Sequence, residues 1–475
     1  MKNSLTNSVI YQNRHILGFF AVAILLYFFI VFGFARTPMG LSASEMESAV
    51  FSAGFSFPDS ILDLPYHFLQ WASVSLTGIS TFSLRLPSVL LALLAAGLVI
   101  LAIRNFTRSN VAIITGALVA SSAFFLNFAR NGSPEIMSIF LLALAVFAIS
   151  QIITQRKPRI LWLGLLAVAL ALAVYIPMGV VFAVVLLAVA IISPKSRALL
   201  GQLRSWQIVL AVFVGLVALV PLAVSILMQP SLLPAILGIE NIKYLPADVW
   251  TNIQIIFSPF GAQFGGLVTP LLTLGEIALV ILGIVKLIRD GKSARTAFTI
   301  SIAAVSMIIT ILDPTKAYLM FVPFVFLQAF GVAFIIDHWY KLFPLNPYAR
   351  VLGLVPIAVL IVTMMMVGRG HYLSANFYNV QVVGERNQSF EVLRGEINSM
   401  SAHDITVVAS ESEKEFYRLL TKSYPLVTVT SLPDNKAKTQ ILLPSTFSLR
   451  ANTTPTRVVT SSMSTDNLLL KIYEK

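Results

Sequence analysis

The stretch MGLSASEMESAVFSAGFSFPDSILDLPYHFLQWASVSLTGISTFSLRLPS, residues 39–88, lies between two long apolar runs. It contains acidic residues, prolines and an amphipathic segment, whereas the flanking runs at 16–34 and 84–103 are almost free of charge. Each run is long enough to cross the roughly 30 Å hydrocarbon layer of a membrane as a helix. The stretch is therefore predicted to be a polar loop that joins two membrane-spanning helices.

The composition of the whole chain supports this interpretation. Hydrophobic residues make up 57% of the 475 residues and charged residues only 11%, against about 25% charged in soluble domains. The net charge is +12, but Lys and Arg cluster at the ends of apolar runs, as topology determinants do, so no nucleic-acid partner is expected. The chain has no cysteine, which excludes disulfides, thiolate nucleophiles and cysteine-ligated metals.

The sequence predicts a polytopic α-helical membrane protein with about eleven transmembrane helices. The weakest division falls at 160–193, where Ile176-Pro177-Met178-Gly179 is the one break in a long apolar run. Two helices joined by a tight turn are expected there, because one kinked helix would be far too long. The predicted spans are 16–34, 84–103, 110–127, 135–153, 160–175, 177–193, 207–228, 267–287, 297–312, 317–336 and 351–368.

Basic residues predict the orientation of these spans. With the N-terminus in the cytoplasm, most Lys and Arg fall in the loops on the cytoplasmic side, as the positive-inside rule requires. The loop at 39–88, the short segment from Arg130 to Glu135, the 229–266 loop and the Asp313 to Lys316 segment then face outside. The expected location is the plasma (inner) membrane, as a multi-pass protein with an extracytoplasmic C-terminus.

Two domains are predicted, with a change of composition near residue 370. Residues 1–369 form the transmembrane domain, and residues 370–475 have the charge content and alternating patterns of a small α/β domain. Helices are expected at 385–400 and 411–422. Strands are expected at 404–410, 425–431, 439–443, 456–461 and 468–473. The segment has no glycine-rich phosphate loop, which argues against a nucleotide site.

Acidic residues are costly in a membrane unless they are solvated or paired, so those on the outer side are candidates for function. If the segment after the first span is helical, Glu45 and Glu47 point about 200° apart, and only one of them faces inward. The alternative for both is a solvated interfacial helix. Glu276 lies inside the predicted 267–287 span and is an isolated intramembrane acid.

Three further groups of residues have a functional and a structural interpretation. His67, in the helical pattern 65–78 together with the interfacial aromatics Tyr66 and Trp71, is either a site residue or a polar tip at the membrane interface. Arg130 and Glu135 flank a turn that opens a helix, which suits either an anion site or simple charge pairing. Lys316 and Tyr318 lie at the mouth of a span and suit a lipid phosphate or interfacial anchoring.

Several of these elements resemble the motifs of one family. Pro65-Tyr66-His67 through Trp71, Leu84-Arg85-Leu86-Pro87-Ser88, the Arg130 to Glu135 segment and Lys316-Ala-Tyr318 through Pro323 resemble GT-C membrane glycosyltransferases. The similar branch contains protein O-mannosyltransferases, aminoarabinose transferases and RgtA-like transferases. The resemblance implies transfer of a sugar from a polyprenyl-phosphate donor to an acceptor hydroxyl on the outer face.

The resemblance also implies roles for individual residues. Glu45 is the expected general base, with Glu47 in reserve, because such a transfer needs a carboxylate near the acceptor hydroxyl. The cations that stabilise the departing phosphate are expected to be Arg85, Arg130 and Lys316, with Tyr318 beside them. Glu135 and His67 would orient the acceptor or a cation. A divalent cation, Mg or Mn, would be held by Glu45 and Glu135.

Ser44 departs from the family pattern. It stands where the family has the aspartate of an Asp-Glu pair, and a neutral hydroxyl cannot act as that base. One interpretation is that Glu45 or Glu47 has taken over. The other is a catalytically lapsed relative that binds a lipid-linked glycan or assists cell-envelope assembly. A transporter is a third class. The expected partners are the lipid-linked sugar donor, membrane lipid, and a glycan, lipid or protein acceptor.

Overall fold

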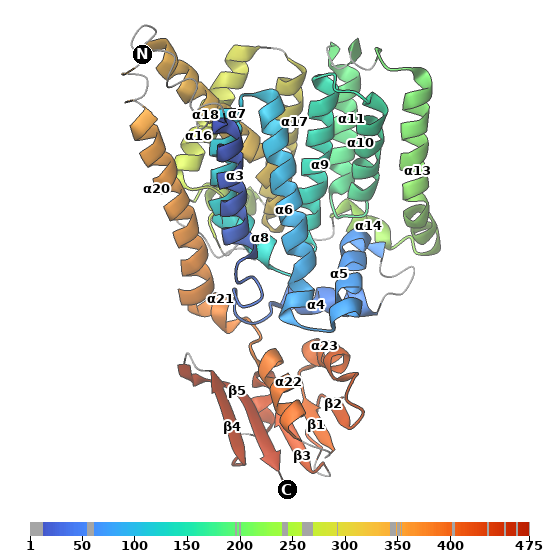
Figure 1. Ribbon diagram of the computed structural model, residues 1–475. Helices are drawn as coiled ribbons and strands as arrows, with labels where there is room; N and C mark the ends of the chain where they lie inside the picture. The colour runs from blue at the N-terminus through green and yellow to red at the C-terminus, as the bar shows by residue number, and fades with distance from the viewer. Residues whose placement is uncertain are drawn as a thin grey trace.

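The computed structural model contains a bundle of apolar helices with a small sheet domain at one end (Figure 1). The first described helix, α3 (Arg14–Leu26), starts toward the end of the bundle that is away from the sheet domain. The structure describes residues 13–474 except 55–60, 195–196, 199–200, 240–245, 259–268, 292, 343–347, 349–351, 353, 401–403, 435–436, 451–452 and 462–463.

Each of the eleven predicted spans contains a helix. Seven helices are long and apolar enough to cross a membrane in the described part of the chain, and one bent pair adds an eighth. The helices of the bundle are α3 (Arg14–Leu26), which continues as η1 (Tyr27–Val31), α6 (Thr81–Phe106), α7 (Ser109–Ser121), α8 (Ala123–Arg130), α9 (Glu135–Ile153), α10 (Arg159–Ala173), α11 (Gly179–Ile192), α13 (Ser205–Met228), α16 (Leu274–Asp290), α17 (Ala294–Leu312), η3 (Pro314–Met320), α18 (Phe321–Leu342) and α20 (Leu354–Leu373).

The division of the 160–193 run into two helices is confirmed. Helices α10 and α11 are separated by a turn at which Met178 adopts a positive φ of 65°. Gly179 begins α11 there, and a Cβ at this position would collide with the carbonyl of Ala173. The break predicted around Pro177 is therefore a tight reversal that only glycine accommodates at its end.

Two predicted spans differ from the structure. The 110–127 span is broken after Ser121, and α7 and α8 meet at an angle of 62°. This bend carries Arg130 at the end of α8 into the protein instead of outward. The 267–287 span begins later, at α16, because Thr273 caps that helix. Glu276 accepts hydrogen bonds from the Thr273 backbone N–H at 2.7 Å and from its hydroxyl at 2.9 Å, so it lies at a helix start and not mid-span.

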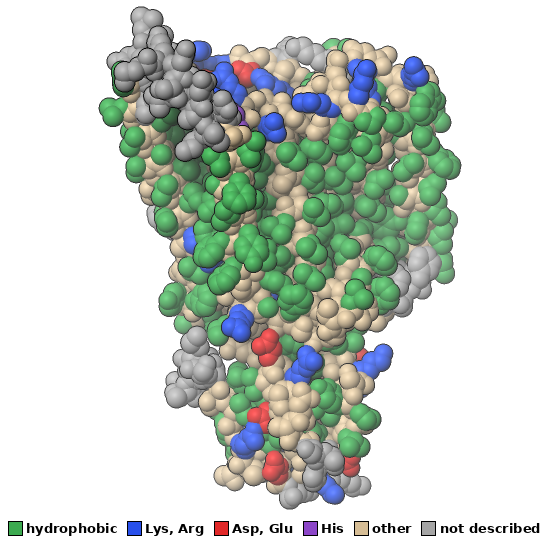
Figure 2. Space-filling view, viewed as in Figure 1, with side chains coloured by type: hydrophobic (Ala, Val, Ile, Leu, Met, Phe, Trp, Pro, Cys, Tyr) green, Lys and Arg blue, Asp and Glu red, His purple; other side chains and the backbone are tan. Residues whose placement is uncertain are grey.

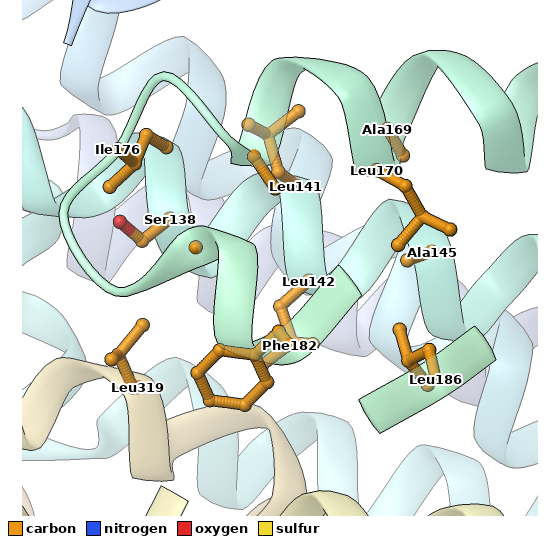
Figure 3. Close-up of a pocket in the computed structure, with 12 residues that line it drawn as sticks. Ser138, Leu141, Leu142, Ala145, Ala169, Leu170, Ile176, Phe182, Leu186 and Leu319 are labelled. Atoms are coloured by element: carbon orange, nitrogen blue, oxygen red, sulfur yellow. The ribbon is translucent and has the colours of Figure 1, made fainter. Parts of the chain in front are cut away.

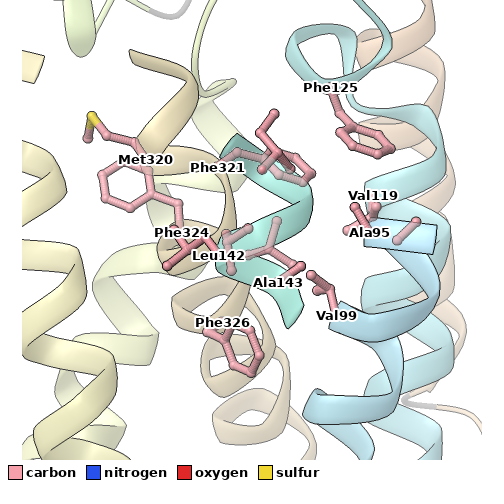
Figure 4. Close-up of a cluster of buried hydrophobic side chains, with 14 of the residues drawn as sticks. Ala95, Val99, Val119, Phe125, Leu142, Ala143, Met320, Phe321, Phe324 and Phe326 are labelled. Atoms are coloured by element: carbon pink, nitrogen blue, oxygen red, sulfur yellow. The ribbon is translucent and has the colours of Figure 1, made fainter. Parts of the chain in front are cut away.

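The core of the bundle is built from bulky apolar side chains of α6 to α9 and the η3–α18 segment. Figure 4 shows Phe125, Phe321, Phe324 and Phe326 packed together with small residues of α6 and α9 such as Ala95. Phe125 and Phe321 stack with ring centroids 4.6 Å apart. This rigid packing fixes the outer ends of α8, α9 and η3, which carry the candidate site.

Helices α16 and α18 cross with their backbones in close contact. A Cβ at Gly331 would collide with the Leu279 carbonyl, and one at Gly283 with the Leu327 carbonyl. Replacing Gly331 by alanine is therefore expected to destabilise the protein by about 1–3 kcal/mol through overpacking. Thermal unfolding in detergent measures this. Gly97→Ala in α6 is the matched control, because nothing lies within 4 Å of its added Cβ, and equal behaviour of the two variants would contradict the prediction.

Between the first spans, α4 (Ala43–Ala53) and α5 (Leu64–Thr77) form a small layer at the sheet-facing end of the bundle (Figure 1). Helix α5 confirms the predicted amphipathic helix. Trp71 is half exposed, as an interfacial residue would be, but Tyr66 is fully buried and bonds to Ser88 through its hydroxyl at 2.7 Å. Tyr66 is therefore a core residue and not a membrane-exposed aromatic.

The expected α/β domain is present in the tail. Its sheet has the order β2-β1-β3-β5-β4, with β1, β2 and β3 parallel and β5 antiparallel to both β3 and β4. The tail elements are η4 (Ser374–Tyr378), α21 (Val380–Gly384), α22 (Ser389–Ser399), β1 (Ile405–Val408), α23 (Glu411–Thr421), β2 (Val427–Thr430), β3 (Thr439–Leu442), η5 (Pro444–Arg450), β4 (Arg457–Ser461) and β5 (Ser464–Glu474).

The tail domain is docked on the α4 loop. Leu41 and Asn387 form an isolated antiparallel bridge, with N···O distances of 2.9 and 2.8 Å. Leu41 and Ala49 also share an apolar cluster with Phe416 of α23. The polar loop that precedes α4 is thus held between the bundle and the sheet domain, which restricts the positions of its acids.

Two helices of the predicted 229–266 loop are described, α14 (Leu232–Leu237) and α15 (Pro246–Ile256). The stretches 240–245 and 259–266 lie outside the described residues. Figure 2 shows Lys and Arg side chains gathered at the end of the bundle away from the sheet domain. By the positive-inside rule, this end of the bundle is expected to face the cytoplasm.

Candidate functional site

Glu45 lies in the first turn of α4, where the sequence Ser42-Ala-Ser-Glu45 forms a capping box. The Glu45 backbone N–H donates to the Ser42 hydroxyl at 3.2 Å, and the Ser42 N–H donates to Glu45 Oε2 at 2.9 Å. Such a box satisfies N–H groups that the helix start leaves unpaired. It turns the Glu45 side chain inward, where it is fully buried, and leaves Glu47 exposed. Only one of the two acids faces inward, as predicted.

Arg85 is the main partner of Glu45. Its Nε donates to Glu45 Oε1 at 2.7 Å and its Nη2 to Oε2 at 3.2 Å. The remaining donors reach three backbone carbonyls, those of Phe34 at 3.3 Å, Pro38 at 2.7 Å and Gly40 at 2.6 Å. All five N–H groups of the guanidinium are thus engaged. Arg85 has no donor left for a phosphate in this arrangement.

A third partner of Glu45 comes from the loop between α8 and α9. The Gly132 N–H donates to Glu45 Oε1 at 2.8 Å, while Gln70 of α5 donates to the Gly132 carbonyl at 3.1 Å. A Cβ at Gly132 would lie 2.7 Å from the Leu84 carbonyl oxygen, so glycine is needed for this close approach. Glu45 therefore ties α4, α6 and the α8–α9 loop together.

Charge around Glu45 favours its ionised form. Burial alone would raise the pKa of Glu45, but Arg85, Arg386 and the Gly132 N–H outweigh burial and hold this pKa below the ordinary glutamate value. Both carboxylate oxygens already accept hydrogen bonds. Glu45 as a general base stays a prediction, and it requires these bonds to open. The observed geometry fits a positioning role directly.

His67 is buried between α4 and α5. Its Nδ1 lies 3.1 Å from the Ser52 hydroxyl, which also donates to Gln70 at 2.6 Å. Burial lowers the pKa of His67 to about 4, so the ring is neutral near pH 7. These contacts are those of a helix–helix packing residue, and its predicted role in orienting an acceptor remains untested by the geometry.

A second group of charges lies where α5, α9 and η3 begin. Asp63 interacts electrostatically with both Glu135 and Lys316, and the Tyr318 hydroxyl interacts with Asp63, Glu135 and Asp313. Glu135 Oε2 and Asp313 Oδ2 are buried and have no hydrogen-bond partner among the described residues. The structure thus brings Glu135, Lys316 and Tyr318 together, as the resemblance implied, and adds two aspartates.

Asp63 stands out in this group. Its backbone adopts a left-handed conformation, φ 52°, immediately before the proline-containing start of α5. Burial, and then the charge of Glu135, raise its pKa to about 7 against the opposing effect of Lys316. A carboxyl group with a pKa near the working pH is suited to general base catalysis.

An apolar crevice runs beside this second group. Figure 3 shows Leu141, Leu142, Leu170 and Phe182 lining it, with Ser138 and Leu319 at one end. Leu319 follows Tyr318 in η3, so the crevice approaches the charged group from within the bundle. Its volume of about 20 Å³ is too small for a sugar ring or for an isoprene unit, so in this structure it is an apolar packing gap beside the charged group.

Arg130 does not pair with Glu135 in the described part of the chain, and its contacts are not those of Lys316 and Tyr318. Its Nη2 donates to the Phe32 carbonyl at 2.6 Å, and its guanidinium lies 5.8 Å from the Tyr372 ring centroid. It forms no ion pair with Glu135 among the described contacts. The four predicted phosphate ligands therefore divide: Arg85 is bound to Glu45, Arg130 lies near α20, and Lys316 and Tyr318 lie near Asp63.

A metal held by Glu45 and Glu135 does not fit this arrangement. Both Glu45 oxygens are occupied by N–H donors, and the described residues contain no group of three His, Asp or Glu side chains placed for a metal ion. A Mg²⁺ or Mn²⁺ ion requires several oxygen ligands. No catalytic step is therefore derived through a metal.

Sequence reasoning did not select Asp63, Arg369, Tyr372 or Arg386. Asp63 was one of several acids in the first loop, and its neighbours in space come from segments far away in the chain. One signal was available for the arginines: Arg369 is a charged residue next to the end of the last apolar run, on the side where basic residues are few.

Comparison with known proteins bears on the class of this fold. Residues 64–224 match the family model described as dolichyl-phosphate-mannose-protein mannosyltransferase. ArnT from Cupriavidus metallidurans in the apo state has a TM-score of 0.57 at 13% identity, over 97% of this chain and 98% of that chain. Comparison with curated proteins found no significant match.

Two further solved structures are similar. ArnT from Cupriavidus metallidurans bound to undecaprenyl phosphate has a TM-score of 0.55 at 14% identity, over 98% of both chains. The apo oligosaccharyltransferase from Archaeoglobus fulgidus has a TM-score of 0.55 at 12% identity, over 91% of this chain and 66% of that chain. The chain therefore has the GT-C fold of membrane glycosyltransferases. The fold expected from the motif resemblance is confirmed.

Proposed function

We propose that this protein is a membrane glycosyltransferase that moves a sugar from a polyprenyl-phosphate donor to an acceptor hydroxyl. The observation that carries the proposal is the group formed by Asp63, Glu135, Lys316 and Tyr318, which three distant segments bring together on a GT-C scaffold. The similar ArnT structure that contains undecaprenyl phosphate supports a donor of this lipid class.

This transfer requires a carboxylate base and a cation that stabilises the leaving phosphate, and the group contains both. The acceptor oxygen attacks the anomeric carbon, its proton passes to a carboxylate, and the bond from that carbon to the phosphate oxygen breaks. Asp63 is the proposed base, with Glu135 beside it to orient the acceptor. Lys316 stabilises the negative charge that develops on the departing polyprenyl phosphate, and the Tyr318 hydroxyl assists it.

In this proposal Glu45 and Arg85 do not touch the substrates but hold other residues of the site in place. They fix the α8–α9 loop, and with it Glu135, relative to α4 and α6. Glu47 is exposed on α4 and remains a reserve candidate for the base. The reaction takes place at the membrane face that carries the tail domain, which is the outer face of the plasma membrane if the basic end of the bundle is cytoplasmic.

The second candidate is a catalytically lapsed relative that binds a lipid-linked glycan. Ser44, which replaces the aspartate of the family pattern, is exposed on α4, with its hydroxyl 3.0 Å from that of Ser42. Binding of a polyprenyl-phosphate sugar by the purified protein without turnover, in the wild type and in Ser44→Asp alike, would favour this candidate over a transferase.

Lys316 provides the direct test of the transferase. In proteoliposomes supplied with polyprenyl-phosphate sugars, Lys316→Met is expected to lower the transfer rate by about 10²–10³-fold, because one charge-stabilising donor is lost. Lys414→Met is the control, since Lys414 only pairs with Glu411 on the tail domain at 3.1 Å. Equal rates in Lys316→Met and wild type would remove Lys316 from the mechanism.

A further inference from the structure

A cluster of arginines surrounds Tyr372 near the sheet-facing end of α20. Tyr372 is fully buried and lies in the field of four guanidinium groups, those of Arg130, Arg386, Arg85 and Arg369. The Arg369 guanidinium lies 5.6 Å from the Tyr372 ring centroid and 5.2 Å from that of Phe29 in η1. Helices α8 and α20 pack together at this point. We call Arg130, Arg369, Arg386 and Tyr372 the arginine cluster.

The cluster has more positive charge than its described surroundings neutralise. Glu45 is the one carboxylate among the described residues that pairs with it, and Glu45 is already bound to Arg85. Arg386 Nη1 lies 3.7 Å from Glu45 Oε2, which is too long for a hydrogen bond. Buried charges without a partner are costly, by several kcal/mol in real proteins, so this surplus requires an explanation.

Unused hydrogen-bond donors accompany the surplus charge. Arg130 and Arg386 are at least nine-tenths buried. Among the described residues, Arg130 Nε, Arg369 Nη1, Arg386 Nε and Nη1, and the Tyr372 hydroxyl are buried without a hydrogen-bond partner. The other contacts of Arg386 are modest: Nη2 reaches Asn131 Oδ1 at 3.4 Å and Asn376 Oδ1 at 3.2 Å. A set of donors on three arginines and one tyrosine matches a tetrahedral oxyanion.

The location of the cluster indicates where the anion comes from. Arg369 and Tyr372 belong to a membrane-spanning helix, and α20 exposes Val362, Met366 and Val367 on its surface just before Arg369. In Figure 2, blue side chains interrupt the hydrophobic surface in the region of α3 and α20. A lipid whose chains lie along this apolar surface would place its headgroup at Arg369.

We propose that the arginine cluster binds the phosphate group of a membrane lipid at the junction of η1, α8 and α20. The site joins the end of the last span to the linker that leads into the tail domain, so an occupied site also fixes Arg386 beside Glu45. The proposal does not depend on the transfer reaction, because it is tested by binding alone.

Lipid binding is measured on the full-length protein in detergent, by native mass spectrometry and by thermal unfolding. Phosphatidylglycerol, polyprenyl phosphate, inorganic phosphate and the uncharged lipid diacylglycerol are added separately. Arg369→Gln and Arg386→Gln are expected to weaken binding of the phosphate-bearing lipids at least about tenfold, the effect of losing a charge-assisted bond. Arg104→Gln is the matched control. Like Arg369, Arg104 lies near the end of a spanning helix and its guanidinium packs on an aromatic ring, that of Phe19 at 5.6 Å from the centroid, so this variant should bind the lipids as the wild type does.

The sign of the stability change gives a second readout. Without added lipid, Arg369→Gln is expected to unfold at a higher temperature than wild type, because it removes an uncompensated charge, and to lose the stabilisation that the phospholipid gives. If Arg369→Gln fails to fold, Arg369→Lys replaces it in the binding measurement. Lysine keeps the positive charge but lacks the planar guanidinium, so this variant should bind the phosphate-bearing lipids more weakly than the wild type.

The source of the phosphate follows from the same titrations. Stabilisation by phosphatidylglycerol indicates that the site binds a phospholipid headgroup. Stronger binding of polyprenyl phosphate indicates that it binds the sugar donor's lipid or the released product. Stabilisation by inorganic phosphate alone indicates an ion site without a lipid, which overturns the proposal. Equal lipid affinity in wild type, Arg369→Gln and Arg386→Gln would also overturn it.

Discussion

Asparagine in place of Asp63 is expected to lower sugar transfer by about 10²–10⁴-fold, the contribution of a positioned general base. The side chain keeps its size but can no longer accept the proton of the acceptor hydroxyl. The fold should persist, because the backbone N–H and C=O of Asp63, which bond to Tyr175 and to Tyr66 and His67, are unchanged. Donor binding should also persist, since Lys316 and Tyr318 are untouched.

The pH dependence of transfer separates a base from a merely structural acid. Burial and Glu135 raise the pKa of Asp63 to about 7, and the deprotonated carboxylate is the active form of a base. The transfer rate of the wild type should therefore rise as the pH increases through about 7 and fall below it. In Asp63→Asn the residual transfer rate should no longer rise with pH in this range.

Asp404→Asn is the matched control for this experiment. Asp404 is an exposed acid of the tail domain that precedes β1, so its loss should leave both the rate and the pH profile unchanged. An Asp63→Asn variant with the wild-type pH profile would show that another group causes the rise of the rate with pH. Glu135 would then be the next residue to replace.

The scaffold was predictable because its signals are local. Apolar runs of about 20 residues indicate spanning helices, and the alternating patterns after residue 404 indicate strands, so each predicted span contains a helix and all five strands were found. The 62° break between α7 and α8 was not predicted, because Ser121 and Ser122 give no proline or glycine signal. Tertiary contacts accompany the break: Phe125 of α8 stacks on Phe321 of α18, and α8 packs against α20.

The candidate site was only partly predictable because it depends on contacts between distant segments. Motif resemblance selected Glu135, Lys316 and Tyr318, which the structure brings together. It also selected Glu45 as the base and Arg85 as a phosphate ligand, whereas Arg85 donates two N–H groups to the two Glu45 oxygens and the other three to backbone carbonyls. No pattern in one sequence shows that a carboxylate and a guanidinium far apart in the chain bind each other.

Replacing Glu45 by glutamine is expected to destabilise the protein by about 3–5 kcal/mol, because Arg85 is left as an uncompensated buried charge. The structure contains no alternative acid within ion-pair distance of Arg85 among the described residues. Because the folded-state pKa of Glu45 is held below its ordinary value, this contribution is present at neutral pH and is lost as the pH falls below about 4.5. Thermal unfolding at pH 7 and at acidic pH measures it.

A double-mutant cycle shows whether the pair is the cause. Arg85→Met with Glu45→Gln removes both charges, and the double variant should be more stable than Glu45→Gln alone, as expected when one partner's unpaired charge causes the loss. Glu47→Gln is the comparison on the same helix, since Glu47 is exposed and its loss should change stability by no more than about 0.5 kcal/mol.

The same variant separates the two roles of Glu45 in transfer. If Glu45 positions the α8–α9 loop, Glu45→Gln should lose rate together with stability, and its residual activity should still rise with pH through about 7, because Asp63 remains. If Glu45 is itself the base, the variant should keep its fold and lose transfer completely. A stable, inactive Glu45→Gln would therefore return the catalytic role to the first loop and reduce Asp63 to a neighbour of the acceptor.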